Sequence, residues 1–102
     1  MARAPWLSPT DYPQFLGPNR DATVRGVKLA RDWSARPPRL MWRQPIGAGW
    51  SAFAVVGNSA VTQEQNGEYE MVVCYDLKSG RVKWSHRDHD KYESTIAGDG
   101  PR

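Results

Sequence analysis

Between residues 53 and 84, short apolar runs alternate with polar turns that contain glycine. The runs cover residues 53–56, 60–63, 69–75 and 81–84. They are separated by Gly57-Asn58, Asn66-Gly67 and Ser79-Gly80, dipeptides that favour tight turns. Each run has the length of a strand, and no segment has sustained helical periodicity. The pattern therefore predicts an all-β, four-stranded antiparallel meander within residues 40–87.

The last of these turns lies within residues 74–84, which read C-Y-D-L-K-S-G-R-V-K-W. Asp76 and Ser79 have side chains that can hydrogen-bond to the backbone across the bend, and Gly80 can adopt the positive φ that closes it. Trp84 follows on an outer strand, where we expect its large ring to be buried. The segment resembles the tryptophan-docking motif A-x-D-x-x-[ST]-G-x-x-x-W of quinoprotein-type β-propellers, with Cys74 in the alanine position.

A second tryptophan, Trp42, lies 42 positions before Trp84 in a similar local sequence. Residues 40–44 read L-M-W-R-Q, and residues 82–86 read V-K-W-S-H. The interval is about one propeller blade, which takes roughly 40 to 50 residues. The resemblance implies that residues 40–47 form a ring-closing strand, which would complete the last blade of a propeller. A different interpretation places Trp42 in the core of a small barrel.

Two further segments extend the resemblance over residues 11–102. Residues 11–22 read D-Y-P-Q-F-L-G-P-N-R-D-A. They are similar to the D-W-P-Q-F-R-G-P-N-R-D-G opening of bacterial PQQ-binding-like propeller proteins, with departures at Tyr12, Leu16 and Ala22. Residues 92–102 contain Tyr92-Glu93 and end in G-D-G-P-R, which resembles the family's connection to a following blade.

The resemblance implies a division of the chain into an arm and the N-terminal part of a PQQ-like β-propeller. Residues 1–39 form a proline-rich, basic and largely irregular arm. Residues 40–47 are the closing strand, 50–87 the first antiparallel blade, and 88–102 an interblade connection. One blade leaves both faces of its sheet uncovered, so we expect the chain to be a fragment of a larger propeller. Assembly of several copies into a ring, or a small domain that carries the motif, are the alternatives.

Composition and charge restrict the classes of partner. No apolar run is long enough to cross a bilayer. The net charge of +3 comes from residues 1–45, which hold eight basic and three acidic residues, whereas residues 46–102 hold six basic and eight acidic ones. The basic residues of the arm have little aromatic interleaving, unlike a platform that stacks bases. We therefore expect the remaining blades or another protein as partner, rather than nucleic acid.

Candidate metal ligands are confined to one stretch. His86, Asp88, His89 and Asp90 lie in a segment that we expect to be a solvated turn, without a second ligand group at the spacing typical of zinc sites. The sequence therefore predicts no specific metal site. Cys74 is the single cysteine, so it forms no intrachain disulfide, and we expect it to be a small buried packing residue.

Two functions follow from the resemblance. The first is a non-catalytic scaffold or binding module, similar to the outer-membrane assembly lipoprotein propellers. The alternative is a PQQ-dependent dehydrogenase whose active site lies in other blades, so that PQQ and calcium are possible only in a complete propeller. No catalytic or cofactor-binding residue can be assigned in this chain, which favours the scaffold. The resemblance also implies a periplasmic or exported protein, although residues 1–6 lack the apolar stretch of a signal peptide.

Overall fold

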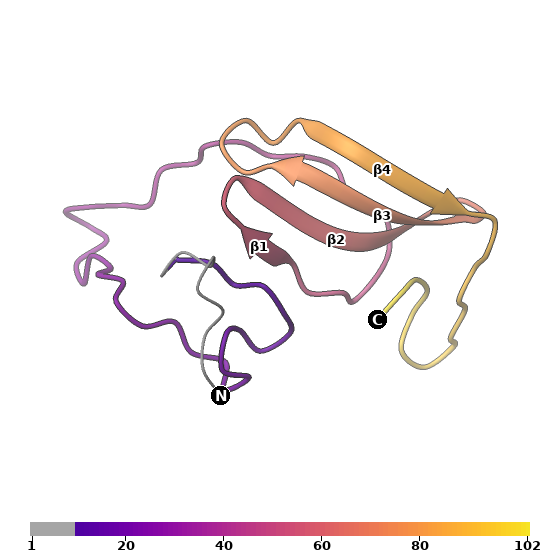
Figure 1. The fold of residues 1–102 in the computed structure, drawn as a ribbon, viewed down its shortest axis with the longest axis horizontal. Helices are drawn as coiled ribbons and strands as arrows, with labels where there is room; N and C mark the ends of the chain where they lie inside the picture. The colour runs from indigo at the N-terminus through magenta and orange to yellow at the C-terminus, as the bar shows by residue number, and fades with distance from the viewer. Residues whose placement is uncertain (1–9) are drawn as a thin grey trace.

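The computed structural model of this chain describes residues 10–102, and these residues form no helix. Their regular structure is one antiparallel sheet of four strands in the order β1-β2-β3-β4 (Figure 1). The strands are β1 (Ala54–Val56), β2 (Ser59–Asn66), β3 (Tyr69–Asp76) and β4 (Val82–Asp88). The prediction of an all-β chain with a four-stranded meander is therefore confirmed.

Two strands are longer than the sequence predicts. β2 continues through polar residues to Asn66, because its backbone stays paired with β3 as far as Tyr69. β4 continues to Asp88, which pairs with Glu70. His86 and Asp88 therefore lie in a strand, and their assignment to a turn was wrong. The apolar pattern ends early here because all of β4 is exposed, so its polar side chains can stay in water.

One face of the sheet is covered by the chain itself. In Figure 1 the segment that leads to β1 passes behind the strands. It brings the rings of Trp42 and Phe53 to Tyr75 of β3, with ring centroids 6.4 Å apart in both pairs. Along β2, Ala60 and Thr62 alternate as buried positions with less buried neighbours, as a strand with one covered face requires.

Residues 40–47 form no strand in the structure. Ala48, directly after them, forms an isolated antiparallel bridge with Gln65 of β2. The partner expected for a closing strand would come from a different blade, so the ring-closing role stays a prediction. Residues 40–47 instead cross the sheet and contribute side chains to its covered face.

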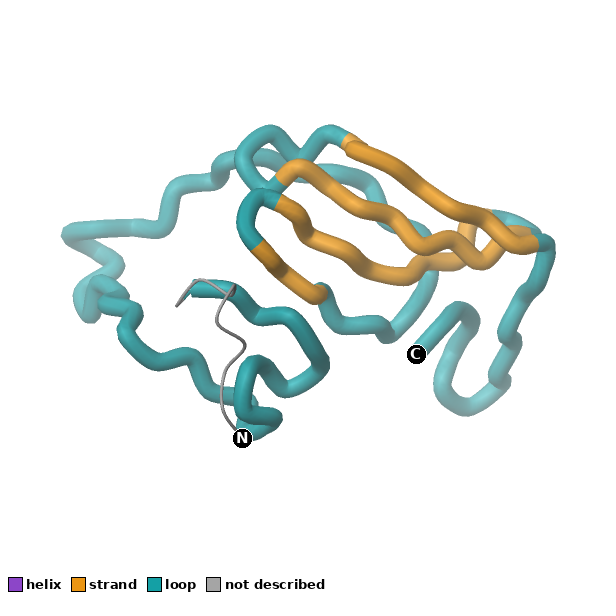
Figure 2. The backbone as a smooth tube through the Cα atoms, in the orientation of Figure 1, coloured by secondary structure: helices purple, strands orange, loops and turns teal. Residues whose placement is uncertain are grey.

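Residues 10–39 of the arm are largely irregular, as expected, but their first part is tied to the sheet beside β1 (Figure 2). The backbone of Tyr12 donates to and accepts from Val55, with both N···O distances 2.7 Å. The carboxylate of Asp11 accepts a hydrogen bond from the backbone N–H of Gly57. The start of the arm motif thus has a structural role beside β1. The first nine residues of the predicted arm lie outside the described residues.

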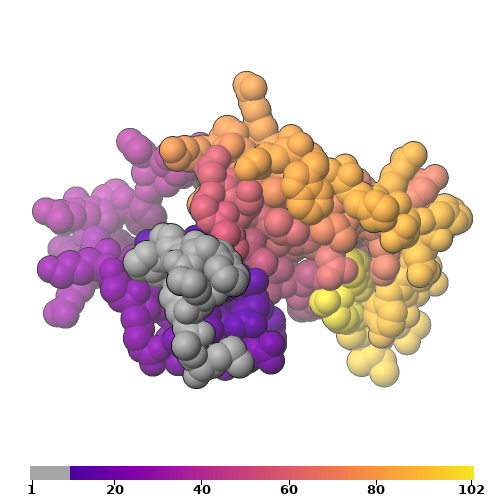
Figure 3. Space-filling view, in the orientation of Figure 1, coloured from indigo at the N-terminus to yellow at the C-terminus, as the bar shows by residue number. Residues whose placement is uncertain are grey.

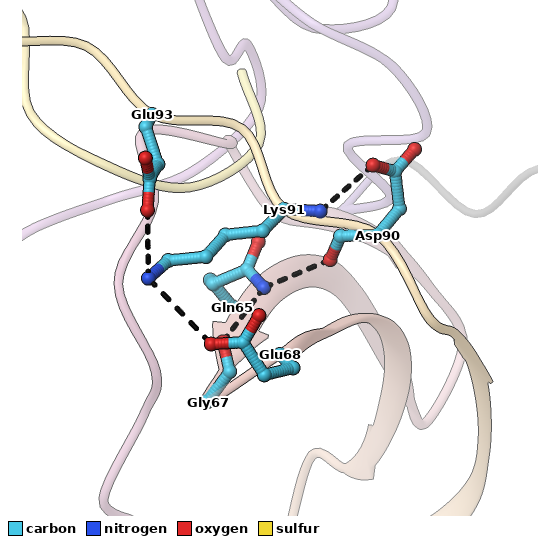
Figure 4. Close-up of polar contacts among 6 residues, drawn as sticks. All are labelled: Gln65, Gly67, Glu68, Asp90, Lys91 and Glu93. Carbon is cyan, nitrogen blue, oxygen red and sulfur yellow. Dashed lines mark hydrogen bonds and ion pairs between the residues drawn. The ribbon is translucent and has the colours of Figure 1, made fainter.

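Residues 88–102 fold back against the sheet. The amide of Gln65 donates to the carbonyls of Gly67 and Asp90, both at 3.0 Å (Figure 4). Nearby, the ammonium of Lys91 lies 2.9 Å from Glu93 and 3.9 Å from Glu68 in the β2–β3 turn. These contacts fasten the start of the predicted interblade connection to the end of the sheet.

The chain is less compact than a typical globular domain of the same length. Its radius of gyration is 15.8 Å, compared with about 13 Å for a compact domain of this size. Figure 3 shows the arm extending to one side of the strands and the C-terminal segment to the other. Within residues 10–102 no helix is long and apolar enough to cross a membrane.

Candidate docking site

The turn between β3 and β4 is held by a network of short hydrogen bonds centred on Asp76. One of its carboxylate oxygens accepts from the backbone N–H groups of Lys78 and Ser79, at 3.0 and 2.9 Å. The other accepts from the side-chain amide of Asn58 at 2.6 Å. Gly80 has a φ of 72° and donates its N–H to the carbonyl of Asp76. The predicted hydrogen bonds of Asp76 to the backbone and the predicted positive φ of Gly80 are confirmed.

The same hydrogen bonds favour the ionised form of the Asp76 carboxyl. The pKa of Asp76 is lowered, chiefly by the backbone N–H of Ser79. The hydroxyl of Ser79 accepts a hydrogen bond from the N–H of Arg81, so this residue also acts as predicted. Asn58 was not predicted to belong to this site. It comes from the β1–β2 turn, and only the pairing of β2 with β3 brings it beside Asp76.

Trp42 docks on this turn. Its indole N–H donates to the carbonyl of Leu77 at 2.8 Å, and its ring lies against Gly80. A Cβ atom on Gly80 would be only 2.5 Å from two ring carbons of Trp42, so the glycine is needed for close approach as well as for its φ. The amide of Gln44 donates to the carbonyl of Gly80 at 2.7 Å. The segment before the sheet is therefore anchored to the turn twice.

A buried aromatic group lies beneath Trp42. Tyr75 is 4% exposed, stacks on Trp42 with an interplanar angle of 24°, and donates its hydroxyl proton to Glu64 at 2.9 Å. Burial, followed by the hydrogen bond and the charge of Glu64, raises the pKa of Tyr75 to about 12. Sequence patterns did not predict this pair, because the two residues meet only through the register of β2 and β3.

Trp84 does not belong to the cluster formed by Trp42, Tyr75 and the β3–β4 turn. Trp84 is 50% exposed, so the expectation that its ring would be buried was wrong for this chain. The reason is its position: β4 is an edge strand, and among the described residues no segment pairs with its outer side. Cys74, which pairs with Trp84 across the strands, is 1% exposed, and its predicted role as a buried packing residue is confirmed.

The four candidate metal ligands do not converge. His86 and Asp88 lie 3.2 Å apart along β4, whereas the ring of His89 packs edge-on against Tyr69. The carboxylate of Asp90 accepts from the backbone N–H of Lys91. Across residues 10–102, no group of three or more such side chains has an arrangement that could hold a metal ion.

Comparison with known proteins adds no assignment. No protein-family model matches the chain, and neither a curated protein nor a solved structure matches it.

Replacing Gly80 tests the close approach of Trp42. Gly80→Ala is expected to destabilise the chain by about 1–2 kcal/mol for the positive φ and by a further ~1–3 kcal/mol for the overlap with the indole ring. Gly67→Ala is the matched control, because Gly67 has a φ of 60° and a Cβ atom there would meet nothing within 4 Å. Urea denaturation measures the free energy of unfolding of both variants. Gly80→Ala should destabilise the chain more than Gly67→Ala does, and this difference should disappear in a Trp42→Ala background. A difference that persists without the indole would contradict the docking of Trp42 on Gly80.

Alkaline titration tests the Tyr75–Glu64 pair. Because the folded state favours the neutral phenol, the stability that Tyr75 contributes is complete below pH ~10 and is lost as the pH rises to about 12. Ultraviolet absorbance should show one tyrosine titrating near pH 12, and Tyr75→Phe should remove that step. Glu64→Gln should shift it to lower pH, since the carboxylate charge is lost. An unshifted step in Glu64→Gln would contradict the assigned contact.

Proposed function

We propose that this chain is a non-catalytic β-propeller scaffold or binding module, and that its sheet acts as one blade of a larger PQQ-like propeller. The observation that supports this most is the docking of Trp42 on the turn that contains Leu77 and Gly80. The contact joins two segments about one blade apart in sequence. It is specific, because it combines an indole hydrogen bond with a glycine that permits close approach.

The spacing of the two tryptophans extends this argument. Trp42 and Trp84 have similar neighbours in sequence and lie 42 positions apart. Trp42 covers a turn of this sheet, whereas Trp84 is half exposed on the edge strand. If the same contact repeats along the protein, Trp84 covers the corresponding turn of a following blade. Remaining blades, or another protein with an equivalent turn, are therefore the proposed partners.

The extent of burial supports an assembly larger than one sheet. The chain exposes 8073 Å² of surface, compared with about 5,800 Å² for a compact monomer of 11.5 kDa. Among the described residues the buried apolar side chains are few: Ala60, Val73, Cys74, Tyr75 and Pro101. A core of this size contributes little stability, which supports the proposal that a partner buries further apolar surface of the chain.

Self-association tests the proposed use of Trp84. The chain of residues 1–102 is expected to associate with rising concentration, because its exposed edge and indole lack their blade partner. Trp84→Lys should weaken this association by about tenfold or more, as expected for loss of a central aromatic contact. Trp33→Lys is the control, since Trp33 is 58% exposed in the arm. Sedimentation equilibrium measures the association of both variants. A stable compact monomer would contradict the proposal, and so would equal effects of the two substitutions.

Titration with the family's cofactors separates the scaffold from the dehydrogenase. A site for PQQ and calcium would draw ligands from several blades, so the chain is expected to take up neither tightly. Calorimetry with calcium and PQQ, alone and together, makes the measurement. Stoichiometric, tight uptake of either would favour the quinoprotein enzyme. Weak binding of divalent zinc or nickel that is lost in His86→Ala would involve only the exposed pair on β4 and would leave the scaffold proposal unchanged.

A further inference from the structure

A cavity of about 370 Å³ lies where four segments of the chain meet, and the proposed docking of blades does not use it. Its walls include Phe15 from the arm, Trp50 and Phe53 from the segment before β1, Gln63 from β2, and Arg102 at the C-terminal end. In Figure 1 the C-terminal end lies beside the segment that leads to β1. The volume is within the range of sites for small ligands, about 300–1,000 Å³.

Backbone contacts hold the walls in position. The pairing of Tyr12 with Val55 places the loop that carries Phe15 beside β1. The N–H of Trp50 donates to the carbonyl of Pro101 at 2.8 Å, which joins two walls directly. The site is thus built by parts of the arm motif and of the C-terminal motif, which are far apart in sequence.

The guanidinium group of Arg102 is also fixed. It donates to the carbonyls of Gly98 and Gly100 at 2.9 and 3.0 Å, and it lies 4.8 Å from the ring centre of Tyr92 and 6.0 Å from that of Trp50. These contacts occupy two of the five N–H donors of an arginine, so the others are free to bind a ligand oxygen. A positioned guanidinium loses little conformational entropy on binding a carboxylate.

The chemistry of the lining selects the ligand. Arg102 carries the one charged side chain among the described residues that line the cavity, and its guanidinium can pair with an anionic group of a ligand. Trp50 is 69% exposed. An indole ring has a flat face with negative charge density, which complements the weakly positive C–H groups of a sugar ring. The amide of Gln63 can exchange hydrogen bonds with hydroxyl groups. We propose that this cavity binds an acidic saccharide, namely a uronic acid residue of a polysaccharide.

An acidic peptide fits less well. Extended peptides usually gain affinity by adding a strand to a free sheet edge. Here the edge of β1 is already paired, because both backbone groups of Val55 bond to Tyr12. The neighbouring part of β2 is paired as well, through Ala48 and Gln65. A ligand that stacks on a ring and presents a carboxylate does not need that edge.

The inference deepens the proposed function, since it gives the binding module a ligand class. It rests on the proposed function only for the role of the ligand. The cavity itself needs no other blade, because all of its walls belong to this chain. Failure of saccharide binding while Trp84-dependent association persists would therefore overturn this inference alone.

The experiment is calorimetric titration of the 102-residue chain with tetragalacturonate. Saturable one-site binding is expected, with Trp50→Ala and Arg102→Gln each weakening it by about tenfold or more. Trp50→Tyr should keep most of the affinity, because a ring remains. Trp33→Ala is the matched control for loss of an exposed indole and should change the affinity less than about twofold.

Three results would overturn the proposal. They are no saturable binding of tetragalacturonate, equal binding of its methyl ester, and equal binding of tetraglutamate. The methyl ester keeps the sugar rings but removes the charge. Tetraglutamate keeps four carboxylates without the rings, so equal binding would assign the site to an acidic protein segment instead.

Discussion

The arrangement of this chain depends on one contact, in which the indole of Trp42 donates to Leu77 and covers Gly80. The contact closes a loop of 35 residues and draws the segment before β1 across the sheet. Without it, the ring of Tyr75 would lose its stacking partner. Burial of Tyr75 in turn allows its hydroxyl to satisfy the buried carboxylate of Glu64, which would be costly to leave unpaired.

The turn that receives Trp42 has hydrogen bonds of its own that do not involve the indole. Asp76 satisfies two backbone N–H groups and the amide of Asn58, so the peptide that contacts the ring is fixed by hydrogen bonds from two hairpins. A preorganised acceptor lowers the entropic cost of docking, because only Trp42 and its neighbours must be ordered. This explains how a small core can still hold an otherwise irregular segment in one place.

The features that were predicted correctly from the sequence are those that depend on local chemistry. The hairpin turns, the all-β class, the roles of Asp76 and Gly80, and the burial of Cys74 all depend on residues close together in sequence. The contacts of Asn58 and Glu64 depend on strand register, which local patterns do not specify when a strand continues through polar residues. The contact of Trp42 depends on a non-strand segment that meets a turn 35 residues away in sequence. The wrong expectations have the same origin: β4 kept its pairing beyond its apolar residues, and Trp84 remained exposed because it is on an edge.

The two isolated bridges have a consequence for assembly. Tyr12 occupies the outer side of β1, and Ala48 occupies β2 beyond the end of β1, so this side of the sheet has no free ladder within residues 10–102. In the same part of the chain, only β4 can accept another strand. Edge-to-edge pairing through the part of the chain that the structure describes can therefore join only two copies, since β4 is the one open edge there. The fold is protected in this way against the unlimited cross-β polymerisation to which a sheet with two open edges is prone.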